Sequence, residues 1–430
     1  MTPEVKKRIE QIRQGIVPEG YVKDKDGIYP RDWASKKIGQ WLKLAERSIV
    51  LQDEEEYQLV TIRRGFGGVD SRGSFLGKNV LVKNYFIVKT GDFIISKRQI
   101  AHGACGIVPP ELDGAVVSNE YNVFLPQDGT NIQMFNLMMQ LPHYKRLFYL
   151  MSDGVHIEKL LFKTQDWMKR TLAMPLLKEQ KKIAEILSTQ DKAIELQERK
   201  IDELKRFKKG CLERMFPRKG QKVPEKRFPG FTDDWEQRKF SELVQIERGG
   251  SPRPIDDFIT DAPNGLNWVK IGDAPTQGNY ITKTAEKIRP EGLSKTREVH
   301  PGDLILSNSM SFGKPYIMGI DGCIHDGWLL IRNTYGVFDL TFLCHLLGTP
   351  QMLSQYRSLA AGSTVNNLNK ELVGNTVVTI PSITEQRVLG DYLEQLDNLI
   401  TFHQRKLEEM KKQKKALMQL LLTGIVRVQS

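Results

Sequence analysis

The feature that most constrains this chain of 430 residues is a long helical segment that occurs twice. The first copy runs from Pro175 to Phe216 and the second from Pro381 to Leu422, 206 positions later. Each begins with a proline and contains no other, so nothing interrupts a helix. Residues that recur at this displacement include the pairs Glu179 and Glu385, Gln180 and Gln386, Leu187 and Leu393, and Asp191 and Asp397. The fold therefore has to accommodate two versions of one long helix.

Apolar residues of both copies follow a single heptad register. In the first copy they are Ile183, Leu187, Ile194, Ile201, Leu204, Cys211 and Met215, with Gln190, Gln197 and Lys208 at the remaining positions. In the second copy they are Leu389, Leu393, Leu396, Ile400, Leu407, Met410, Leu417 and Leu421. A stripe this narrow is typical of a coiled coil, because a helix packed on a globular core shows a broader one. We expect the copies to pair as an antiparallel coiled coil; the alternative is two independent helices, each packed on its own domain.

The regions in front of the two helices also resemble each other. Both contain short apolar runs broken by glycine, which predict β-strands, and a helical window covers 132–150. Asp32-Trp33 is matched by Asp234-Trp235, and VKTGDFIIS at 88–96 by VHPGDLILS at 299–307. The displacement drifts between such pairs, as expected for a duplicated domain with loop insertions.

The predicted fold class is α+β, with two pseudo-symmetric α+β domains and two long helices between them. The predicted boundaries are 1–175 for the first domain with a short N-terminal helix, 176–216 for the central helix, 217–232 for a linker, 233–381 for the second domain and 382–424 for the C-terminal helix.

Composition bounds the function classes. The net charge of +11 and the pI near 9.2 favour a polyanionic partner. The cysteines Cys105, Cys211, Cys323 and Cys344 are scattered, which indicates reduced thiols rather than a disulfide framework. The N-terminal residues lack a signal-peptide pattern, and no apolar stretch is long enough to span a membrane. We expect a cytoplasmic protein.

Signatures of enzymes are missing from the sequence. The best phosphate-loop candidate, Gly73 to Asn79, has one residue too few between its glycines and an asparagine in place of the magnesium-binding Ser or Thr. His156 and Glu158 resemble a deaminase pair, but no Cys-x-x-Cys follows. There is no Asn/Asp-Pro-Pro-aromatic tetrapeptide of the amino-methyltransferase type. The sequence therefore favours a binding protein and predicts no catalytic residue and no metal site.

The repeated pattern is similar to the specificity subunits of type I restriction–modification systems. The resemblance rests on Gly91-Asp92 and Gly302-Asp303 in the two domains, on the segment RFPGFTDDWEQRKF at 227–240, and on the Pro…Glu-Gln opening of both helices. It covers essentially the whole chain. The second half carries Gly362-Ser363-Thr364, as the family favours, whereas the first half has Gly154-Val155-His156.

The resemblance implies a non-catalytic DNA-specificity subunit in which each domain recognises half of a bipartite, asymmetric DNA target. The helices would set the spacer and dock two methyltransferase subunits, and two restriction subunits would join them. No cofactor is expected in this chain; S-adenosylmethionine, ATP and Mg²⁺ would bind the partner subunits. The alternatives are a stand-alone bipartite methyltransferase system without a restriction subunit, a coiled-coil adaptor without a DNA role, and an enzyme acting alone.

Candidate DNA contacts are basic and amide side chains on glycine-rich loops, since Lys and Arg hold phosphates and Arg, Asn and Gln can bind base edges. The predicted residues are Arg63, Arg64, Arg72, Lys97, Arg98, Gln99, His102, Arg253, Lys270, Asn308, Ser309, Ser311, Lys314, Thr364, Asn366 and Asn367. Glu179, Gln180, Glu385 and Gln386 are predicted either to dock the partner subunits or to cap their own helices.

Overall fold

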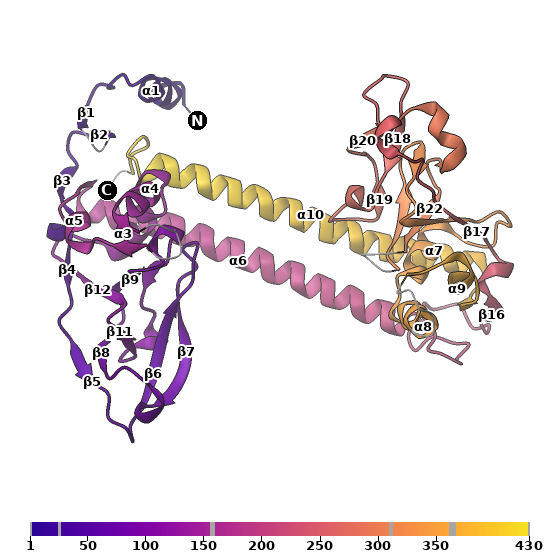
Figure 1. Ribbon diagram of the computed structural model, residues 1–430, viewed down its shortest axis with the longest axis horizontal. Helices are drawn as coiled ribbons and strands as arrows, with labels where there is room; N and C mark the ends of the chain where they lie inside the picture. The colour runs from indigo at the N-terminus through magenta and orange to yellow at the C-terminus, as the bar shows by residue number, and fades with distance from the viewer. Residues whose placement is uncertain (1, 25–26, 155–159, 309–312, 361–366, 429–430) are drawn as a thin grey trace. The chain divides into compact units, whose positions relative to one another are not determined.

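A computed structural model describes residues 2–24, 27–154, 160–308, 313–360 and 367–428 of the chain. It divides into two compact units (Figure 1). Unit 1 comprises Met1–Glu195 with Glu409–Ser430, and unit 2 comprises Leu196–Glu408. The two predicted long helices are present as α6 (Leu177–Arg214) and α10 (Ile383–Leu421). Each unit therefore contains one part of α6 and one part of α10.

Unit 1 holds the first α+β domain. Its helices are α1 (Pro3–Arg13), α2 (Ile38–Trp41), α3 (Ile132–Met139), α4 (Pro142–Leu150) and α5 (Thr164–Met168), with 3-10 turns η1 (Gly77–Asn79), η2 (Ile100–His102) and η3 (Pro110–Leu112). Its strands are β1 (Tyr21–Asp24), β2 (Gly27–Pro30), β3 (Ala34–Lys37), β4 (Leu42–Leu44), β5 (Ser48–Val50), β6 (Glu56–Ile62), β7 (Val69–Leu76), β8 (Asn84–Ile87), β9 (Phe93–Ser96), β10 (Cys105–Ile107), β11 (Val116–Ser118), β12 (Tyr121–Pro126), β13 (Ser152–Asp153), β14 (Leu161–Phe162) and β15 (Thr171–Met174).

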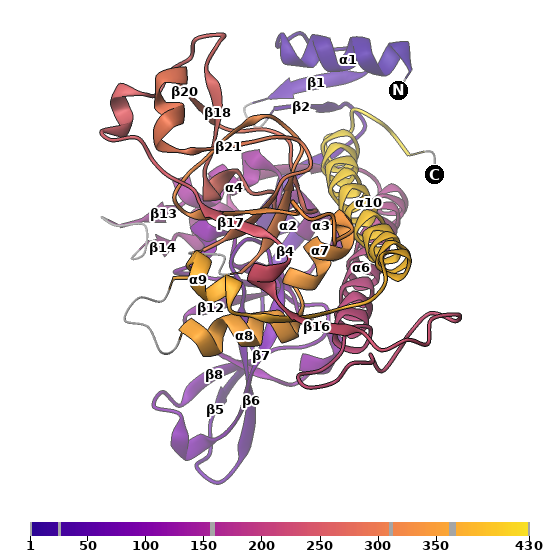
Figure 2. The ribbon, with the colours of Figure 1, turned by 90° about the vertical axis from the view of Figure 1, so that its right-hand side faces the viewer.

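Unit 2 holds the second α+β domain, seen from another side in Figure 2. Its helices are α7 (Leu340–Leu347), α8 (Pro350–Ala360) and α9 (Lys370–Gly374), with 3-10 turns η5 (Phe240–Glu242), η6 (Ile255–Asp257), η7 (Ile271–Asp273) and η8 (Pro290–Lys295). Its strands are β16 (Glu236–Lys239), β17 (Gln245–Arg248), β18 (Leu266–Val269), β19 (Tyr280–Ile281), β20 (Glu286–Ile288), β21 (Arg297–Val299), β22 (Leu304–Ser307), β23 (Pro315–Met318), β24 (Gly322–Ile324), β25 (Trp328–Arg332) and β26 (Val377–Ile380).

The two domains share one sheet topology, which is the structural counterpart of the sequence repeat. The sheet β4-β12-β9-β10 of unit 1 corresponds to β17-β25-β22-β23 of unit 2, where β19 adds a further strand. The strands β8-β11-β6-β7, to which β5 adds a further strand in unit 1, correspond to β21-β24-β18-β20, and in both sheets one pair is parallel (β11 with β6, β24 with β18). The short pairs β3 with β15 and β16 with β26 also correspond. The prediction of two pseudo-symmetric α+β domains is confirmed.

The matched Gly-Asp pairs form the same turn in both domains. Gly91 and Gly302 have φ values of 85° and 95°, a left-handed conformation that favours glycine. The following carboxylates accept hydrogen bonds from backbone amides three residues earlier, Asp92 from Lys89 at 2.7 Å and Asp303 from His300 at 2.9 Å. The motif therefore shapes the turn that leads into β9 and β22.

Each domain packs its helices and one sheet around a core that the long helices complete. In unit 1, Ile183 and Leu187 near the start of α6 and Leu421 at the end of α10 join the cluster around Trp167. In unit 2, the cluster around α7 is completed by side chains from both long helices, including Cys211, Leu389 and Leu393. Because these apolar side chains are buried against the domain, their burial stabilises the long helix and the domain together.

Within each unit the two long helices run antiparallel. In unit 2 the Gln197 carboxamide contacts the Nδ1 atom and the carbonyl oxygen of His403, both at 2.8 Å, and Lys208 pairs with Asp397. In unit 1 Lys414 pairs with Asp191. The partner number on α10 falls as the number on α6 rises, which defines the antiparallel direction. The predicted antiparallel coiled coil is confirmed, including the polar position at Gln197.

Candidate nucleic-acid interface

Two of the predicted DNA-contacting segments of unit 1 lie side by side. One is the arginine loop, residues 63–68, which connects β6 to β7; the other is the β9–β10 loop, residues 97–104. The Gly65 N–H donates to the carbonyl of His102 at 2.7 Å, and the Phe66 N–H donates to that of Gly103 at 2.8 Å. The structure thus joins two groups of candidates that are well separated in the sequence.

Arg63 and Arg98 of these loops are exposed and paired with surface carboxylates. Arg63 donates to Asp70 at 2.9 Å, and Arg98 Nε donates to Glu120 Oε2 at 2.6 Å. Exposed ion pairs of this kind contribute at most about 1 kcal/mol, so a phosphate can replace the carboxylate at little cost. Arg64 is exposed as well. The loop pair therefore presents guanidinium groups that are oriented and accessible.

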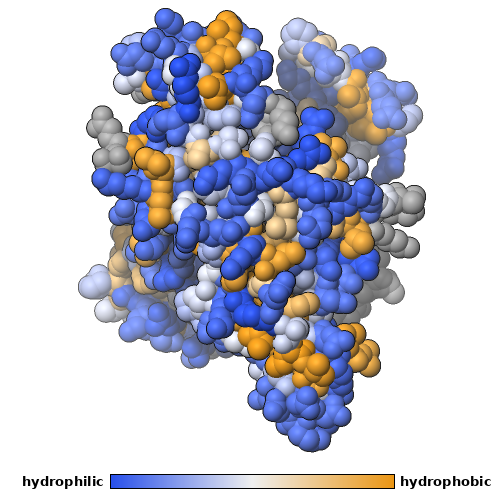
Figure 3. All heavy atoms as spheres, turned by 90° about the vertical axis from the view of Figure 1, so that its left-hand side faces the viewer, coloured by the Kyte–Doolittle hydropathy of each residue, from blue (hydrophilic) through white to orange (hydrophobic). Residues whose placement is uncertain are grey.

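The remaining candidates of unit 1 differ in exposure. Arg72 is exposed on β7, which is an edge strand of its sheet. Lys97, Gln99 and His102 are half-buried. The Gln99 Oε1 atom is buried without a hydrogen-bond partner among the described residues. Figure 3 shows that the face of unit 1 turned to the viewer is largely hydrophilic, which suits a charged ligand better than an apolar one.

In unit 2 one candidate, Asn308, lies at the turn formed by residues 325–327. The Asn308 amide donates to the carbonyl of Asp326 at 2.8 Å, and Ser251 Oγ donates to its carboxylate at 3.1 Å. The Leu368 N–H donates to the carbonyl of Asn308 at 3.0 Å, which brings the exposed Asn367 close. The start of the β22–β23 loop, at Asn308, thus meets the segment before α9.

One candidate of unit 2 needs a correction. The Asn308 side chain is buried and its amide bonds inward, so it holds the turn together instead of reaching for a DNA base. Among the other candidates, Arg253 is exposed, Lys270 is half-buried beside Glu286, and the exposed Lys314 lies 4.8 Å from the ring centre of Tyr316. Ser309, Ser311, Thr364 and Asn366 lie outside the described residues.

Sequence reasoning missed the role of the Gly249-Gly250 pair. A β-carbon on Gly249 would lie 2.2 Å from the carbonyl oxygen of His325, and one on Gly250 would lie 2.3 Å from that of Lys295. Only glycine fits where backbones approach this closely. The sequence feature that could have revealed this role is the glycine pair directly before Ser251 and Arg253. It marks the point at which this loop packs closely against the rest of the domain.

Glu179, Gln180, Glu385 and Gln386 are all buried and bonded inside their own units. The Gln180 carboxamide accepts from the Asn131 N–H at 2.8 Å and donates to the carbonyls of Gly129 and Pro175. Gln386 repeats this set of bonds with the Asp339 N–H and the carbonyls of Val337 and Pro381. Asn131 and Asp339 are the N-caps of α3 and α7. Each glutamine therefore joins the start of a long helix to the start of a short one.

The neighbouring glutamates are held by arginines. Glu179 receives two hydrogen bonds from Arg427, which also binds Asp32, and Glu385 receives two from Arg227, each at 2.7 Å. The hydrogen bonds from Arg427 lower the pKa of Asp32. None of these four side chains is exposed, so none offers a surface on which a partner subunit could dock. Their contacts fit the alternative of a structural role at the start of each long helix. They do not form capping boxes; they connect the start of the helix to other segments of the same unit.

Other side chains of the long helices are exposed and apolar. Leu196 on α6 and Phe402 on α10 are 64% and 60% exposed, and they occupy equivalent positions of the repeat. Single exposed apolar side chains are common on protein surfaces, so what distinguishes these two is their equivalence in the repeat. They were missed because they lie outside the heptad seam.

A polar cluster surrounds Asp397 in unit 2. Asp397 binds Lys208 from α6 and the Asn279 amide, at 2.9 Å, from the segment before β19. Tyr280 donates to Glu394 at 2.8 Å, and its pKa is raised by burial and by this carboxylate. Burial lowers the pKa of the neighbouring His345 to about 4, so this imidazole is neutral at pH 7 and its 3.8 Å approach to Asp397 is not an ion pair. The cluster connects the segment around β19 of the second domain to the portions of α6 and α10 that belong to unit 2.

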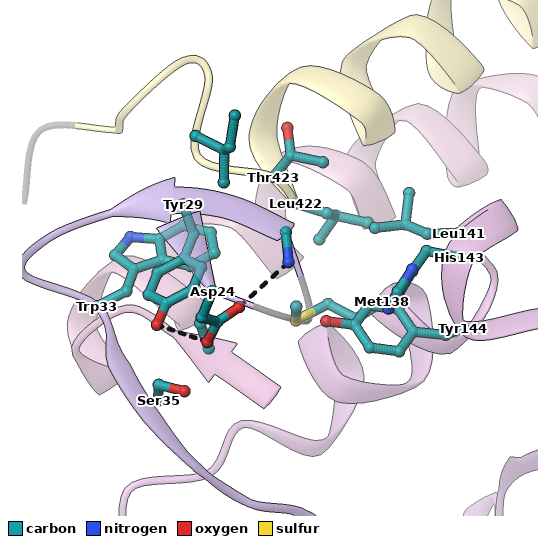
Figure 4. Close-up of a pocket in the computed structure, with 13 residues that line it drawn as sticks. Asp24, Tyr29, Trp33, Ser35, Met138, Leu141, His143, Tyr144, Leu422 and Thr423 are labelled. Carbon is teal, nitrogen blue, oxygen red and sulfur yellow. Dashed lines mark hydrogen bonds between the residues drawn. The ribbon is translucent and has the colours of Figure 1, made fainter. Parts of the chain in front are cut away.

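A cavity of about 110 Å³ lies in unit 1 between the β1–β2 hairpin, the α3–α4 region and the end of α10 (Figure 4). Its lining is mainly apolar and aromatic, with Trp33, Met138 and Tyr144. Its carboxylate, Asp24, is bound by the Tyr29 hydroxyl at 2.9 Å and by the Gly27 N–H at 3.2 Å. The other polar side chains of the lining include Ser35, His143 and Thr423, and none of the predicted site residues is among the lining residues.

Across the described ranges, no group of three or more His, Cys, Asp or Glu side chains is placed to hold a metal ion. In the same part of the chain, no helix combines the length and apolar character needed to cross a membrane. The four cysteines are buried and unpaired, as the sequence predicted.

Comparisons with known proteins agree with this architecture. The family described as "Type I restriction modification DNA specificity domain" matches residues 30–206 and 232–412. The chain is 24% identical over 427 residues to the "Type I restriction enzyme MjaVIII specificity subunit" of Methanocaldococcus jannaschii, covering 93% of this chain and 94% of that protein. Both halves of the repeat are therefore covered by one family.

Solved structures share the fold. A chain from the study "Structural basis underlying complex assembly and conformational transition of the type I R-M system" superposes with a TM-score of 0.61 at 19% identity, covering 93% of this chain and 99% of that one. A type I restriction–modification S subunit from M. genitalium superposes with a TM-score of 0.55 at 12% identity, covering 93% of this chain and 97% of that one. The duplicated domains, the paired long helices and these matches together establish that the chain belongs to the family of type I restriction–modification DNA specificity subunits, the non-catalytic DNA-recognition components of these systems.

Proposed function

We propose that unit 1 and unit 2 each recognise one half of a bipartite, asymmetric sequence in double-stranded DNA. The observation that carries this proposal is that the two domains share one sheet topology but differ in the residues of their corresponding loops. The β9–β10 and β22–β23 loops leave corresponding strands, yet the first carries Lys97, Arg98 and Gln99, whereas the second carries the exposed Lys314 and a buried Asn308. Two copies of one frame with different contact residues are suited to two different half-sites.

The long helices serve, in this proposal, as the spacer between half-sites and as the docking surface for two methyltransferase subunits. Leu196 and Phe402 are compatible with the docking role, because they are exposed, apolar and equivalent in the repeat, so related surfaces of the two helices present them. S-adenosylmethionine would then bind the methyltransferase subunits, and ATP and Mg²⁺ would bind two restriction subunits. The complex would act on DNA in the cytoplasm.

The proposal is tested by mapping methylated adenines in host DNA when this chain is supplied to, or withheld from, its methyltransferase partner. A bipartite motif that is present only with the chain supports the proposal. Methylation without any cleavage of unmodified DNA would identify a system lacking the restriction subunit. An unchanged map, together with no shift of random duplex DNA in a gel, would point to the adaptor alternative and contradict the proposal.

Deleting one heptad from the middle of both long helices is expected to shorten the spacer of the methylated motif by about three base pairs. Seven residues correspond to about 10 Å of helix, and successive base pairs are about 3.4 Å apart. The heptad register of both seams is kept, so the helices can still pair. The methylation map reports spacer and half-sites together: an unchanged spacer would refute the spacer role, whereas the half-site sequences should stay as they are.

Arg98→Ala is expected to weaken or relax recognition of one half-site only, with a loss of roughly tenfold or more in methylation of the cognate target. A bidentate arginine contact to a base contributes about 1–3 kcal/mol of discrimination. Stability should change little, because the pair with Glu120 is exposed. Arg218→Ala is the matched control, since Arg218 is also exposed and paired with one carboxylate, Glu225. Equal losses for both variants would show that Arg98 acts only through net charge.

A further inference from the structure

The arginine loop of unit 1 contains an unusual backbone conformation at Phe66. Its φ is 61°, and it is the single non-glycine residue with positive φ in the described part of the chain. A bulky side chain is rarely found in this left-handed region, and such strain persists where surrounding contacts impose it. The contacts here are the two backbone hydrogen bonds from Gly65 and Phe66 to the β9–β10 loop. The strained backbone of Phe66 is therefore maintained by the contact between the two loops.

The position opposite Phe66 is Gly103, where a larger residue would collide with the ring. A β-carbon on Gly103 would lie 2.9 Å from the Phe66 ring, and its φ of 75° also favours glycine. The Phe66 ring thus packs on the backbone of the β9–β10 loop at Gly103. Because Arg63 and Arg64 directly precede this contact and Arg98 lies on the loop that the ring covers, the relative placement of these side chains depends on it.

We propose that Phe66 and Gly103 are positioning residues that lock the arginine loop onto the β9–β10 loop, so that both loops bind one DNA half-site as a single preformed surface. The inference rests on the proposed function of unit 1 and adds to it two residues that need not touch DNA themselves. The arginine loop has no helix or strand within it, whereas the β9–β10 loop is anchored by Ile100, which is buried in the core of unit 1, so the contact between the loops ties the arginine loop to a fixed support. Preorganised contacts favour binding because less conformational freedom is lost when the ligand arrives.

The test uses the full chain assembled with its methyltransferase subunits and duplexes in which each base pair of both half-sites is varied in turn. Gly103→Ala is expected to reduce discrimination at the half-site of unit 1 by tenfold or more and to leave the other half-site unchanged. The matched control is Gly114→Ala, since Gly114 has a similar φ of 81° but a β-carbon added there would meet nothing within 4 Å. It carries the same backbone penalty without the collision.

Two variants at position 66 separate the lock from general destabilisation. Phe66→Tyr keeps the ring and should retain discrimination. Phe66→Gly relieves the strained backbone and removes the ring, which also packs against the core of unit 1, and should lose discrimination at the same half-site when assayed well below the variant's own melting temperature. Retained discrimination in Phe66→Gly and Gly103→Ala would overturn the lock, as would an equal loss at both half-sites. If the wild-type complex itself shows no bipartite motif, the proposed function fails; if only these variants behave like the wild type, this inference alone fails.

Discussion

Replacing Arg427 by alanine is expected to lower the free energy of unfolding of unit 1 by about 3 kcal/mol, because an ionised carboxylate would be left buried without its partner. Glu179 has a side chain that is 6% exposed, and Arg427 binds both of its oxygens, at 2.9 and 2.8 Å. The same guanidinium donates two hydrogen bonds to Asp32 at 2.8 Å. Hydrogen exchange, which resolves the two units, should show faster opening of unit 1 only.

Two controls decide whether the orphaned charge is the cause. Arg218→Ala removes an exposed partner of Glu225 and should change stability by at most about 1 kcal/mol. Combining Arg427→Ala with Glu179→Leu removes the buried charge as well and should restore much of the loss, since apolar replacement of a buried ion pair is often close to neutral. A double variant no more stable than Arg427→Ala would contradict this account.

Gln386→Leu is expected to destabilise unit 2 by about 3 kcal/mol, and Gln180→Leu should do the same to unit 1. Each glutamine is fully buried and makes three hydrogen bonds to backbone groups, and each lost bond is worth about 1 kcal/mol. The backbone N–H and carbonyls of the partner segments would remain buried without a replacement, so about 3 kcal/mol is the lower end of the expected loss. The measurement is again the exchange protection of each unit.

The matched control is Gln395→Leu on the same helix α10, where the side chain is exposed. Its effect should stay within about 0.5 kcal/mol. Because the two buried glutamines act in different units, their effects should also add when combined. Loss of protection in both units from Gln386→Leu alone would show that the brace is not local.

The helix pair could be predicted because its information is local and periodic. Proline at the start, a heptad seam and the displacement of 206 positions define where each helix begins and which residues face a partner, and the structure confirms both. The two domains could be recognised from the Gly-Asp turns, since a left-handed glycine followed by a capping aspartate leaves a sequence signature. Their strand order could not be read in this way, because pairing between distant strands has no such signature.

The roles of Glu179 and Gln180 were not predictable for a related reason. Arg427 lies 248 positions from Glu179, and the groups that Gln180 binds include the backbone of a loop far away in the sequence. A Glu-Gln pair at the start of a helix can equally be an exposed contact or a buried brace until the burial is known. The same holds for Asn308, whose residue type suits a base contact although its amide is turned inward.

The division of the two long helices between units bears on how the chain folds as it is synthesised. Unit 2 is one continuous stretch, Leu196–Glu408, whereas unit 1 needs Glu409–Ser430, which supply Leu421 to its core and Arg427 to Glu179. Translation proceeds at about 5–20 residues per second, so the N-terminal domain waits roughly 10–50 s for these residues after its own have been made. The domain that is translated first is therefore the one that is completed last.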